Sequence, residues 1–248
     1  MSLNIVVTMA GRSSRFYNAG FHVPKFRIHA HDRSLLEWSL ISLTNFLTPT
    51  MRTIFVCLKE DNAHDFVMQK SKAIGLTNVH ILELEEVTDG QATTAYLSQH
   101  LWNPTWPLLI YNIDTYVKPS ALKPINIRPG SDGWIPCVQV SGEHWSFVKL
   151  GDEGWVIDVA EKRRISKYAS VGLYWFSRAD RYVNLYEQFY KDPRNLVLGE
   201  KYVAPLYRQL LSEDGMVSLI DLEASSVYFL GTPTELSSFT ELTKEEIQ

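Results

Sequence analysis

The feature that most constrains the fold is a regular alternation, over residues 4–114, between short apolar runs and longer helix-like segments. The runs are continuously apolar, as in strands that are covered on both faces. Strands that alternate with helices usually pair in parallel within a layered sheet. We therefore predict an α/β fold: a Rossmann-like layered mixed sheet, mostly parallel, with helices on both faces. The expected strands are 4–9, 53–58, 79–84 and 107–114, and the expected helices are 34–47, 63–74 and 90–101.

The pattern changes near residue 130, where the chain becomes rich in strands. Between two alternating runs lies "GDEG" at 151–154, which is typical of a hairpin turn. No repeat, low-complexity segment or linker marks the change, so we expect one domain over residues 1–248 with two functional halves, about 1–130 and 131–248. The expected strands of the second half are 134–140, 146–150, 155–162, 169–176 and 227–230, and its expected helices are 179–190 and 202–212.

Charge and composition exclude several kinds of partner. The formal net charge of −4 provides no broad basic field, so we expect no nucleic acid and, for phosphate chemistry, only a local cluster of cations. No apolar run approaches the length of a membrane span, and the N-terminus shows no export pattern. Cys57 and Cys137 lie inside apolar runs, which predicts buried thiols in a reducing compartment. We expect a cytoplasmic protein without a membrane partner.

The loop after the first expected strand carries small residues and cations. Glycine and serine let several backbone N–H groups point into one concavity, and the cations add charge, which favours phosphate binding. The loop is neither a Walker loop nor a dinucleotide fingerprint, and a surface loop with solvated cations is the alternative interpretation. The residues concerned are Ala10, Gly11, Arg12, Ser13, Ser14, Arg15 and the Pro24-Lys25 pair.

Gly11, the following small residues, Arg15 and the later Pro24-Lys25 pair together resemble the opening signature of the nucleotidyltransferases that activate sugar phosphates. The resemblance covers roughly residues 4–240 and implies the nucleotide-diphospho-sugar transferase fold. It implies that residues 10–14 wrap the triphosphate of a nucleotide and that Arg15 and Lys25 are catalytic. One departure is Ser13, which replaces the second glycine of the signature and would crowd the backbone where phosphate approaches.

The phrase "DGQATTA" follows the third expected strand. Thr88 and Gln91 have the spacing of a capping box, so the phrase is also explained by a helix start. The resemblance implies that Gly90 and Gln91 receive the base of the nucleotide, with Gly90 leaving room for its edge.

Asp114 ends the fourth expected strand, where an aspartate is otherwise a common turn residue. A carboxylate beside a triphosphate is the hard oxygen ligand that Mg²⁺ takes. The resemblance implies that Asp114 binds Mg²⁺, the expected cofactor. Several family members carry a second aspartate where this chain has Phe229, so either Asp114 is the single protein carboxylate on the metal or another residue substitutes.

The segment "VAEKRRISKYASVGLYWFS" resembles the sugar-phosphate half of the family, although a charge run such as 161–164 is usually an exposed strand end. By this resemblance Glu161 holds hydroxyls of the acceptor, Lys162 holds its phosphate, and Gly172 leaves room for it. Ser170 belongs to the same acceptor-binding set.

The resemblance implies Mg²⁺-dependent transfer of a nucleotidyl group from a nucleoside triphosphate to a sugar 1-phosphate, or to a phosphorylated alcohol such as phosphocholine, with release of pyrophosphate. It also suggests surface polysaccharide assembly. Two alternatives stay open: a glycosyltransferase that uses a nucleotide sugar, and a non-catalytic relative that binds nucleotide or nucleotide sugar. The sequence leaves the base, the acceptor and the formation of a homo-oligomer undetermined.

Overall fold

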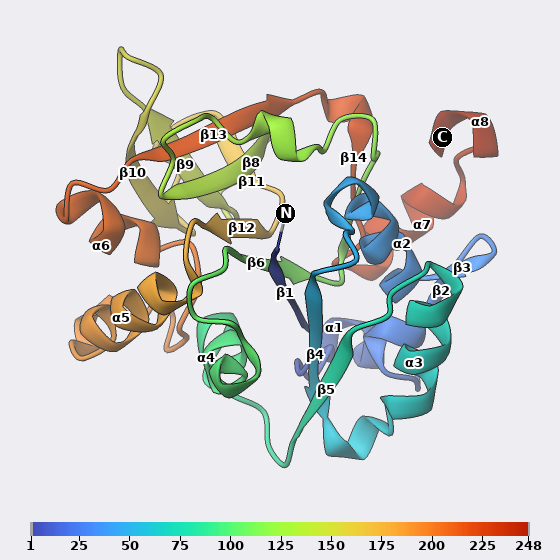
Figure 1. Ribbon diagram of the computed structural model, residues 1–248. Coiled ribbons are helices and arrows are strands. Elements are labelled where there is room, and N and C mark those ends of the chain that lie inside the picture. Colours follow the sequence, from blue (N-terminus) through green and yellow to red (C-terminus); the bar gives the residue numbers. More distant parts are fainter. Residues whose placement is uncertain (1, 248) are drawn as a thin grey trace.

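The computed structural model describes residues 2–247 and is built around one ten-stranded sheet (Figure 1). The strand order is β10-β9-β11-β8-β12-β6-β1-β4-β5, and β13 pairs with β8 off this path. The strands are β1 (Asn4–Thr8), β4 (Arg52–Leu58), β5 (Val79–Leu84), β6 (Leu108–Asn112), β8 (Gly133–Gln139), β9 (Ser146–Leu150), β10 (Val156–Glu161), β11 (Tyr168–Ser170), β12 (Leu173–Phe176) and β13 (Val217–Leu222).

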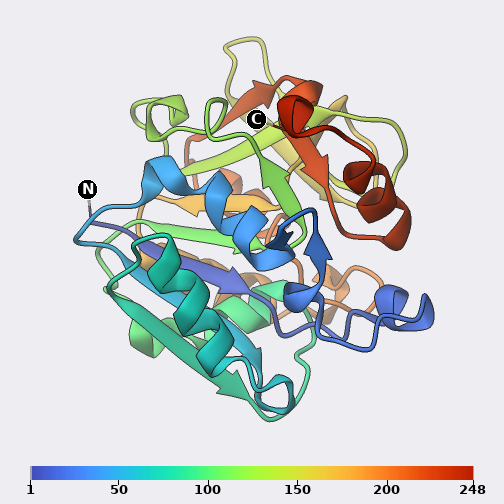
Figure 2. The ribbon, with the colours of Figure 1, turned by 90° about the vertical axis from the view of Figure 1, so that its right-hand side faces the viewer.

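Helices cover both faces of this sheet, as the apolar runs predicted. The helices are α1 (Ser14–Asn18), α2 (Leu35–Ser42), α3 (His64–Ala73), α4 (Gln91–Leu97), α5 (Ala179–Phe189), α6 (Leu206–Ser212), α7 (Pro233–Thr240) and α8 (Lys244–Ile247). Figure 2 shows α2 and α3 side by side on one face, and Figure 1 shows α4, α5 and α6 on the other. Two small sheets complete the fold: β2 (His29–Ala30) with β3 (Arg33–Ser34), and β7 (Thr115–Val117) with β14 (Val227–Phe229).

Side chains in register on the central strands form the two core layers. Val6 on β1 lies opposite Ile54 on β4 and Ile110 on β6, and all three point into the layer beneath α4 and α5. Their neighbours Ile5 and Val7 point into the layer beneath α2 and α3. All five are fully buried, and each such side chain contributes about 1.5–3 kcal/mol through burial. The continuous apolar run therefore fixes β1 at the centre of the sheet.

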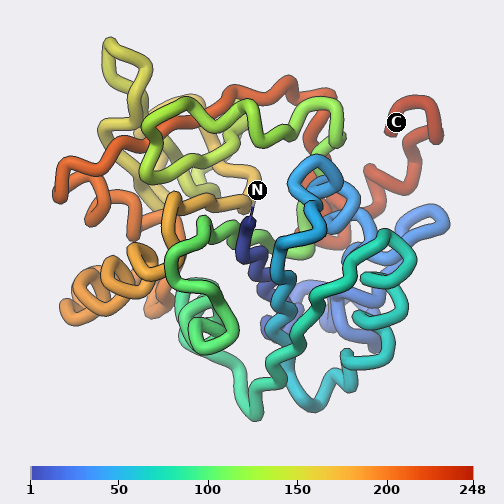
Figure 3. Tube along the Cα trace, viewed as in Figure 1, coloured from blue at the N-terminus to red at the C-terminus, as the bar shows by residue number. Residues whose placement is uncertain are grey.

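The expectation of a mostly parallel sheet is wrong for the second half of the chain. The pairs β1–β4, β1–β6, β4–β5 and β8–β13 are parallel, whereas β9–β10, β8–β11, β9–β11, β6–β12 and β8–β12 are antiparallel. The short turn that joins β9 to β10 allows only antiparallel pairing of these two strands, whereas the other antiparallel pairs join strands that are distant in the chain. The expected hairpin at 151–154 is confirmed, and it projects from the molecule in Figure 3 (yellow).

Two further elements differ from the sequence analysis. The expected strand 169–176 is two strands, β11 and β12, because the chain turns at Gly172, whose φ is +79°. Strand β13 was not expected at all. Since β12 pairs with both β6 and β8, one sheet continues across residue 130, and the division into two functional halves stays a prediction.

The two thiols are buried, as expected: Cys57 and Cys137 are both free and both inside the core. Burial raises the pKa of each thiol. Among residues 2–247, no helix combines the length and the apolarity that a membrane crossing needs.

Candidate active site

Three segments that are distant in sequence meet where β1 and β6 end. They line a hollow of about 510 Å³, here called the loop pocket. It is bordered by every residue predicted to bind nucleotide and by Asp114, so the expected convergence on one rim of the sheet is confirmed. The lining residues include Ala10, Gly11, Arg12, Ser13, Ser14, Gly90, Gln91, Asn112, Asp114 and Glu200.

A second hollow of about 330 Å³ adjoins the loop pocket and is here called the strand pocket. The two pockets share Gln91, Asn112 and Asp114, so these three residues stand at the junction. All the residues predicted to bind the acceptor line the strand pocket, together with Arg15. Its walls include Arg15, Trp145, Ser146, Glu161, Lys162, Ser170, Gly172, Tyr174, Tyr202, Phe229 and Glu235.

Lys25 lines neither of these pockets, but its ammonium reaches their junction. Lys25 Nζ lies 2.7 Å from Asp114 Oδ2, and the two side chains are 13% and 30% exposed. Asp114 is fixed from behind, because its carbonyl accepts a hydrogen bond of 2.7 Å from Leu230 N. The structure thus brings the predicted catalytic lysine and the predicted metal ligand into direct contact.

Ser13 shows why the family signature has glycine at this position. Its φ of +52° is left-handed, a conformation that costs a residue with a Cβ about 1–2 kcal/mol. A Cβ on Gly11, by contrast, would meet no atom within 4 Å. Glycine at position 13 would therefore serve the turn into α1, in which Phe16 N and Tyr17 N donate to Ser13 O.

The room beside Gly90 is occupied by the chain itself, which corrects the expectation that it is left for the base. Gly90 has a φ of +143°, and a Cβ there would lie 2.2 Å from Lys201 O. The segment around Lys201 is held by two backbone bonds, Lys201 N to Asp89 O at 2.7 Å and Ala92 N to Lys201 O at 3.0 Å. Gly90 permits this close approach, which places Glu200 and Tyr202 in the two pockets.

The capping-box interpretation of Thr88 and Gln91 is wrong. Gln91 Nε2 donates to Thr8 Oγ1 at the end of β1 at 3.1 Å, and Thr88 Oγ1 donates to Gly90 O at 2.9 Å. Gln91 therefore ties the start of α4 to the rim of the sheet instead of closing its own helix turn.

Gly172 also has a different role from the expected one. A Cβ at position 172 would lie 2.0 Å from Asn112 Nδ2, so the glycine makes room for Asn112 rather than for an acceptor. Asn112 Oδ1 is buried without a hydrogen-bond partner among the described residues. An unsatisfied buried oxygen is costly, which makes Asn112 a candidate for ligand contact at the junction.

The acceptor side carries a half-buried carboxylate and a constrained lysine. Ser146 Oγ donates to Glu161 Oε2, and Tyr174 adjoins the same serine. Lys162 has a left-handed φ of +51°, and its ammonium donates to Tyr202 OH while lying 4.5 Å from the centre of that ring. Left-handed backbone at a non-glycine residue is a form of strain that clusters at functional sites.

Glu235 is a second carboxylate beside Asp114. A Cβ on Gly231 would lie 3.3 Å from Asp114 Oδ2 and 3.4 Å from Glu235 Oε2, so the two acids flank this glycine. Thr232 caps α7 by accepting from Glu235 N at 3.2 Å, but the Glu235 carboxylate lines the strand pocket instead of returning to the cap. No set of three or more candidate metal-binding side chains occurs within residues 2–247.

These two carboxylate oxygens and the unpaired Asn112 oxygen are hard donors of the kind that Mg²⁺ takes. The residues present therefore fit a magnesium ion held by one or two protein groups. Phe229, at the position of the missing aspartate, packs its ring 4.2 Å from that of Trp145.

No family model and no curated protein matches this chain. Among solved structures, the nucleoside-diphosphate-sugar pyrophosphorylase from Vibrio cholerae RC9 is 32% identical, with a TM-score of 0.88 over 96% of this chain and 100% of that one. The chain belongs to the sugar-phosphate nucleotidyltransferase family. It is accordingly an enzyme of the nucleotidyltransferase type.

Two more distant members of the nucleotidyltransferase family share the fold. The inositol-1-phosphate CTP transferase from T. maritima is 16% identical, with a TM-score of 0.72 over 99% of this chain and 97% of that one. A protein from Bacillus anthracis described as a glucose-1-phosphate thymidylyltransferase, in complex with a sucrose, is 15% identical. Its TM-score is 0.76 over 98% of each chain.

Several site residues of this family member escaped the sequence analysis. Asn112 stood in the same phrase as Asp114, and its place at a strand end was a usable signal. Glu200 and Tyr202 lie on a connection before α6, and nothing in their local sequence indicates that the chain folds back onto Gly90. Glu235 was hidden by its capping-box spacing from Thr232, which favours a purely local role.

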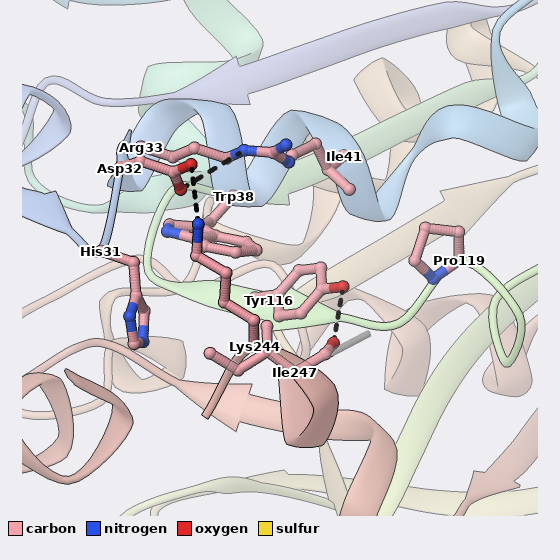
Figure 4. A pocket seen from close by; sticks show the side chains of 9 residues that line it. All are labelled: His31, Asp32, Arg33, Trp38, Ile41, Tyr116, Pro119, Lys244 and Ile247. Carbon is pink, nitrogen blue, oxygen red and sulfur yellow. Dashed lines mark hydrogen bonds and ion pairs between the residues drawn. The ribbon is translucent and has the colours of Figure 1, made fainter. Parts of the chain in front are cut away.

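A third hollow, of about 290 Å³, lies away from the nucleotidyltransferase site (Figure 4). Trp38 and Tyr116 form its apolar wall. Its charged groups contact one another, since Asp32 Oδ1 lies 4.0 Å from Arg33 Nε and Asp32 Oδ2 lies 3.8 Å from Lys244 Nζ. Tyr116 OH donates to Ile247 O, and we assign this hollow no ligand.

Glu161→Gln is expected to raise the melting temperature at neutral pH. Burial raises the pKa of the Glu161 carboxyl above its ordinary value of 4.5, although hydrogen bonding to Ser146 and the charge of Lys162 oppose this. The folded state then holds the proton more tightly than the unfolded state, so stability falls as pH rises from the ordinary pKa through the raised one. The glutamine variant avoids this loss.

Melting curves of both proteins between about pH 4 and 8 would measure the effect. The advantage of the variant should shrink as pH falls through the raised pKa. Glu86→Gln, on an exposed residue, provides the control and should show no such trend. Parallel curves for Glu161→Gln and the unchanged protein would contradict the prediction.

Proposed function

We propose that this protein transfers a nucleotidyl group from a nucleoside triphosphate to a phosphorylated sugar or alcohol, with Mg²⁺ and with release of pyrophosphate. The observation that carries the proposal is the junction of the two pockets. A cation-bearing loop borders one pocket, Lys162 borders the other, and Lys25 and Asp114 stand between them. Two phosphorylated molecules bound in the two pockets would meet at this junction.

In the proposed reaction an oxygen of the acceptor phosphate attacks the α-phosphorus of the nucleotide. The new phosphorus–oxygen bond forms as the bond to the β-phosphate oxygen breaks, and pyrophosphate leaves. The acceptor is already an anion, so no general base is required. The barrier consists mainly of bringing two anions together, which positioning and charge neutralisation lower.

Each of the residues in and around the junction has a role in this proposed reaction. Arg15 and Lys25 would neutralise the triphosphate, and Lys162 would hold the acceptor phosphate. Asp114 and Glu235 would hold the magnesium ion, which when bound neutralises phosphate charge. Without ligands, Lys25 and Asp114 neutralise each other, so binding of a triphosphate would exchange one ion pair for another.

A pyrophosphate-release assay tests the proposal. CTP, UTP, GTP, ATP and dTTP would be crossed with sugar 1-phosphates, inositol 1-phosphate and phosphocholine in the presence of Mg²⁺. Release with one pair is expected and would name both substrates. Transfer from a nucleotide sugar without pyrophosphate release would favour a glycosyltransferase. A shifted melting temperature with nucleotide but no release from any pair would favour a non-catalytic binding protein.

Glu235→Gln is expected to weaken metal binding about tenfold, because it removes one of two carboxylates. Mn²⁺ titrated into the protein and followed by electron paramagnetic resonance measures this without any substrate. The control is Glu241→Gln, on an exposed residue at the other end of α7. Unchanged Mn²⁺ affinity in Glu235→Gln, with lost affinity in Asp114→Asn, would leave Asp114 as the single protein carboxylate.

A further inference from the structure

The wall of the strand pocket includes a loop that receives support from a residue outside it. Residues 140–145 connect β8 to β9 and bring Trp145 into the pocket, where its ring packs 4.2 Å from Phe229. Within the loop, Trp145 Nε1 donates to Ser141 O at 3.1 Å. Gly142 has a φ of +89°, a conformation that glycine adopts without strain.

Arg164 supplies that support from a neighbouring connection, the one between β10 and β11. Its guanidinium donates to Val140 O at 2.6 Å and twice to Gly142 O, at 3.0 and 2.7 Å. It also donates to Ser166 O at 3.3 Å and lies 4.7 Å from the centre of the Phe147 ring. A planar fork of donors is suited to such multiple carbonyl contacts, and an ammonium is not.

The same segment carries Lys162. Lys162 N donates to Trp145 O at 2.9 Å, directly after the register pair between Glu161 and Ser146. The loop and residues 161–164 are therefore joined twice, once by this backbone bond and once by Arg164. A change at Arg164 would loosen Trp145 and the left-handed Lys162 together.

We propose that Arg164, which lines neither the loop pocket nor the strand pocket, is a positioning residue that sets loop 140–145 and thereby the placement of Trp145 and Lys162 for the acceptor. The acceptor part of this inference rests on the proposed function. Arg164 does not act on the triphosphate, because its contacts are confined to the strand-rich half of the chain.

Arg163 provides a matched control. It precedes Arg164, is also exposed, and makes no hydrogen bond or ion pair among the described residues. Arg163→Ala and Arg164→Ala remove the same charge from the same segment, so any difference between them comes from the loop contacts. Arg164→Lys keeps the charge and removes the fork.

The first measurement needs no substrate: hydrogen exchange of the peptides that cover 140–147 and 160–164. Arg164→Ala and Arg164→Lys should both exchange faster there by about tenfold, the effect of losing one hydrogen bond to a charged group, while Arg163→Ala matches the unchanged protein. Equal exchange in all four proteins would overturn the proposal. Full protection from hydrogen exchange in Arg164→Lys would overturn the requirement for the planar guanidinium.

The second measurement is steady-state kinetics with the substrate pair found by pyrophosphate release. Both Arg164 variants should raise KM for the acceptor about tenfold or more and leave KM for the nucleotide within about twofold. Equal increases in the two KM values would overturn the assignment to the acceptor. If the unchanged protein releases no pyrophosphate, the proposed function fails, and the exchange measurement still decides whether Arg164 sets the loop.

Discussion

Lys25→Ala is expected to remove most turnover, by at least about 100-fold in kcat, while the protein stays folded. Loss of one group that stabilises developing charge in a transition state costs about 10²–10³ in rate. Lys25 stands at the junction of the two pockets, where the charges of both substrates would meet. Its removal would also leave the Asp114 carboxylate without its partner cation. The variant therefore loses both a positive charge for the phosphates and the neutralisation of Asp114.

The effect of Lys25→Ala on folding should be small. Asp114 is 30% exposed, so water compensates part of the lost attraction. We expect a loss of about 1 kcal/mol, which corresponds to about 2–4 °C in melting temperature for a chain of this size. The contact of Lys25 with the Phe16 ring, 5.3 Å from its centre, is lost as well.

Pyrophosphate release and thermal melting of the same preparation test this prediction. Lys59→Ala is the control, because Lys59 is 61% exposed and pairs with Glu85 away from both pockets. It should keep full activity. A folded Lys25→Ala protein with full turnover would remove Lys25 from the active site.

Gly90→Ala is expected to destabilise the fold by about 3 kcal/mol or more, because a strained backbone and an overpacked contact each cost about 1–3 kcal/mol. The Cβ would lie 2.2 Å from Lys201 O and 2.6 Å from Lys201 N, and backbone atoms cannot move aside as a side chain can. Relief would require the segment 200–202 to leave α4. Glu200 and Tyr202 would then be displaced from the pockets, so activity should fall together with stability.

Thermal melting should show a fall of about 6 °C or more for Gly90→Ala. Gly11→Ala is the control for stability, since a Cβ there meets no atom within 4 Å. Hydrogen exchange at residues 200–202 would show whether this segment has separated from α4. An unchanged melting temperature and unchanged hydrogen exchange in Gly90→Ala would contradict the close approach of the Lys201 backbone to Gly90.

Local patterns were sufficient to predict most elements of this fold. The expected strand 79–84 coincides with β5, and 146–150 coincides with β9, because an apolar run bounded by turn residues fixes where a strand begins and ends. The partner and direction of a strand depend on residues far away in the chain. This is why β13 went unrecognised and why the sheet as a whole was expected to be mostly parallel.

The candidate site likewise combines residues that the sequence indicated with contacts that only the structure revealed. The cation-bearing loop and Asp114 could be placed from the sequence, since each follows a strand that ends at the same rim, whereas the Glu161-Lys162 pair was found only through the resemblance to the family. What surrounds these residues depends on tertiary contacts: Lys25 lies against Asp114, Lys201 against Gly90, Asn112 against Gly172, and Glu235 beside Asp114. These contacts join residues between 60 and 121 positions apart in the chain, where no local spacing can signal them. They arise because packing the helices on the sheet brings those backbones together.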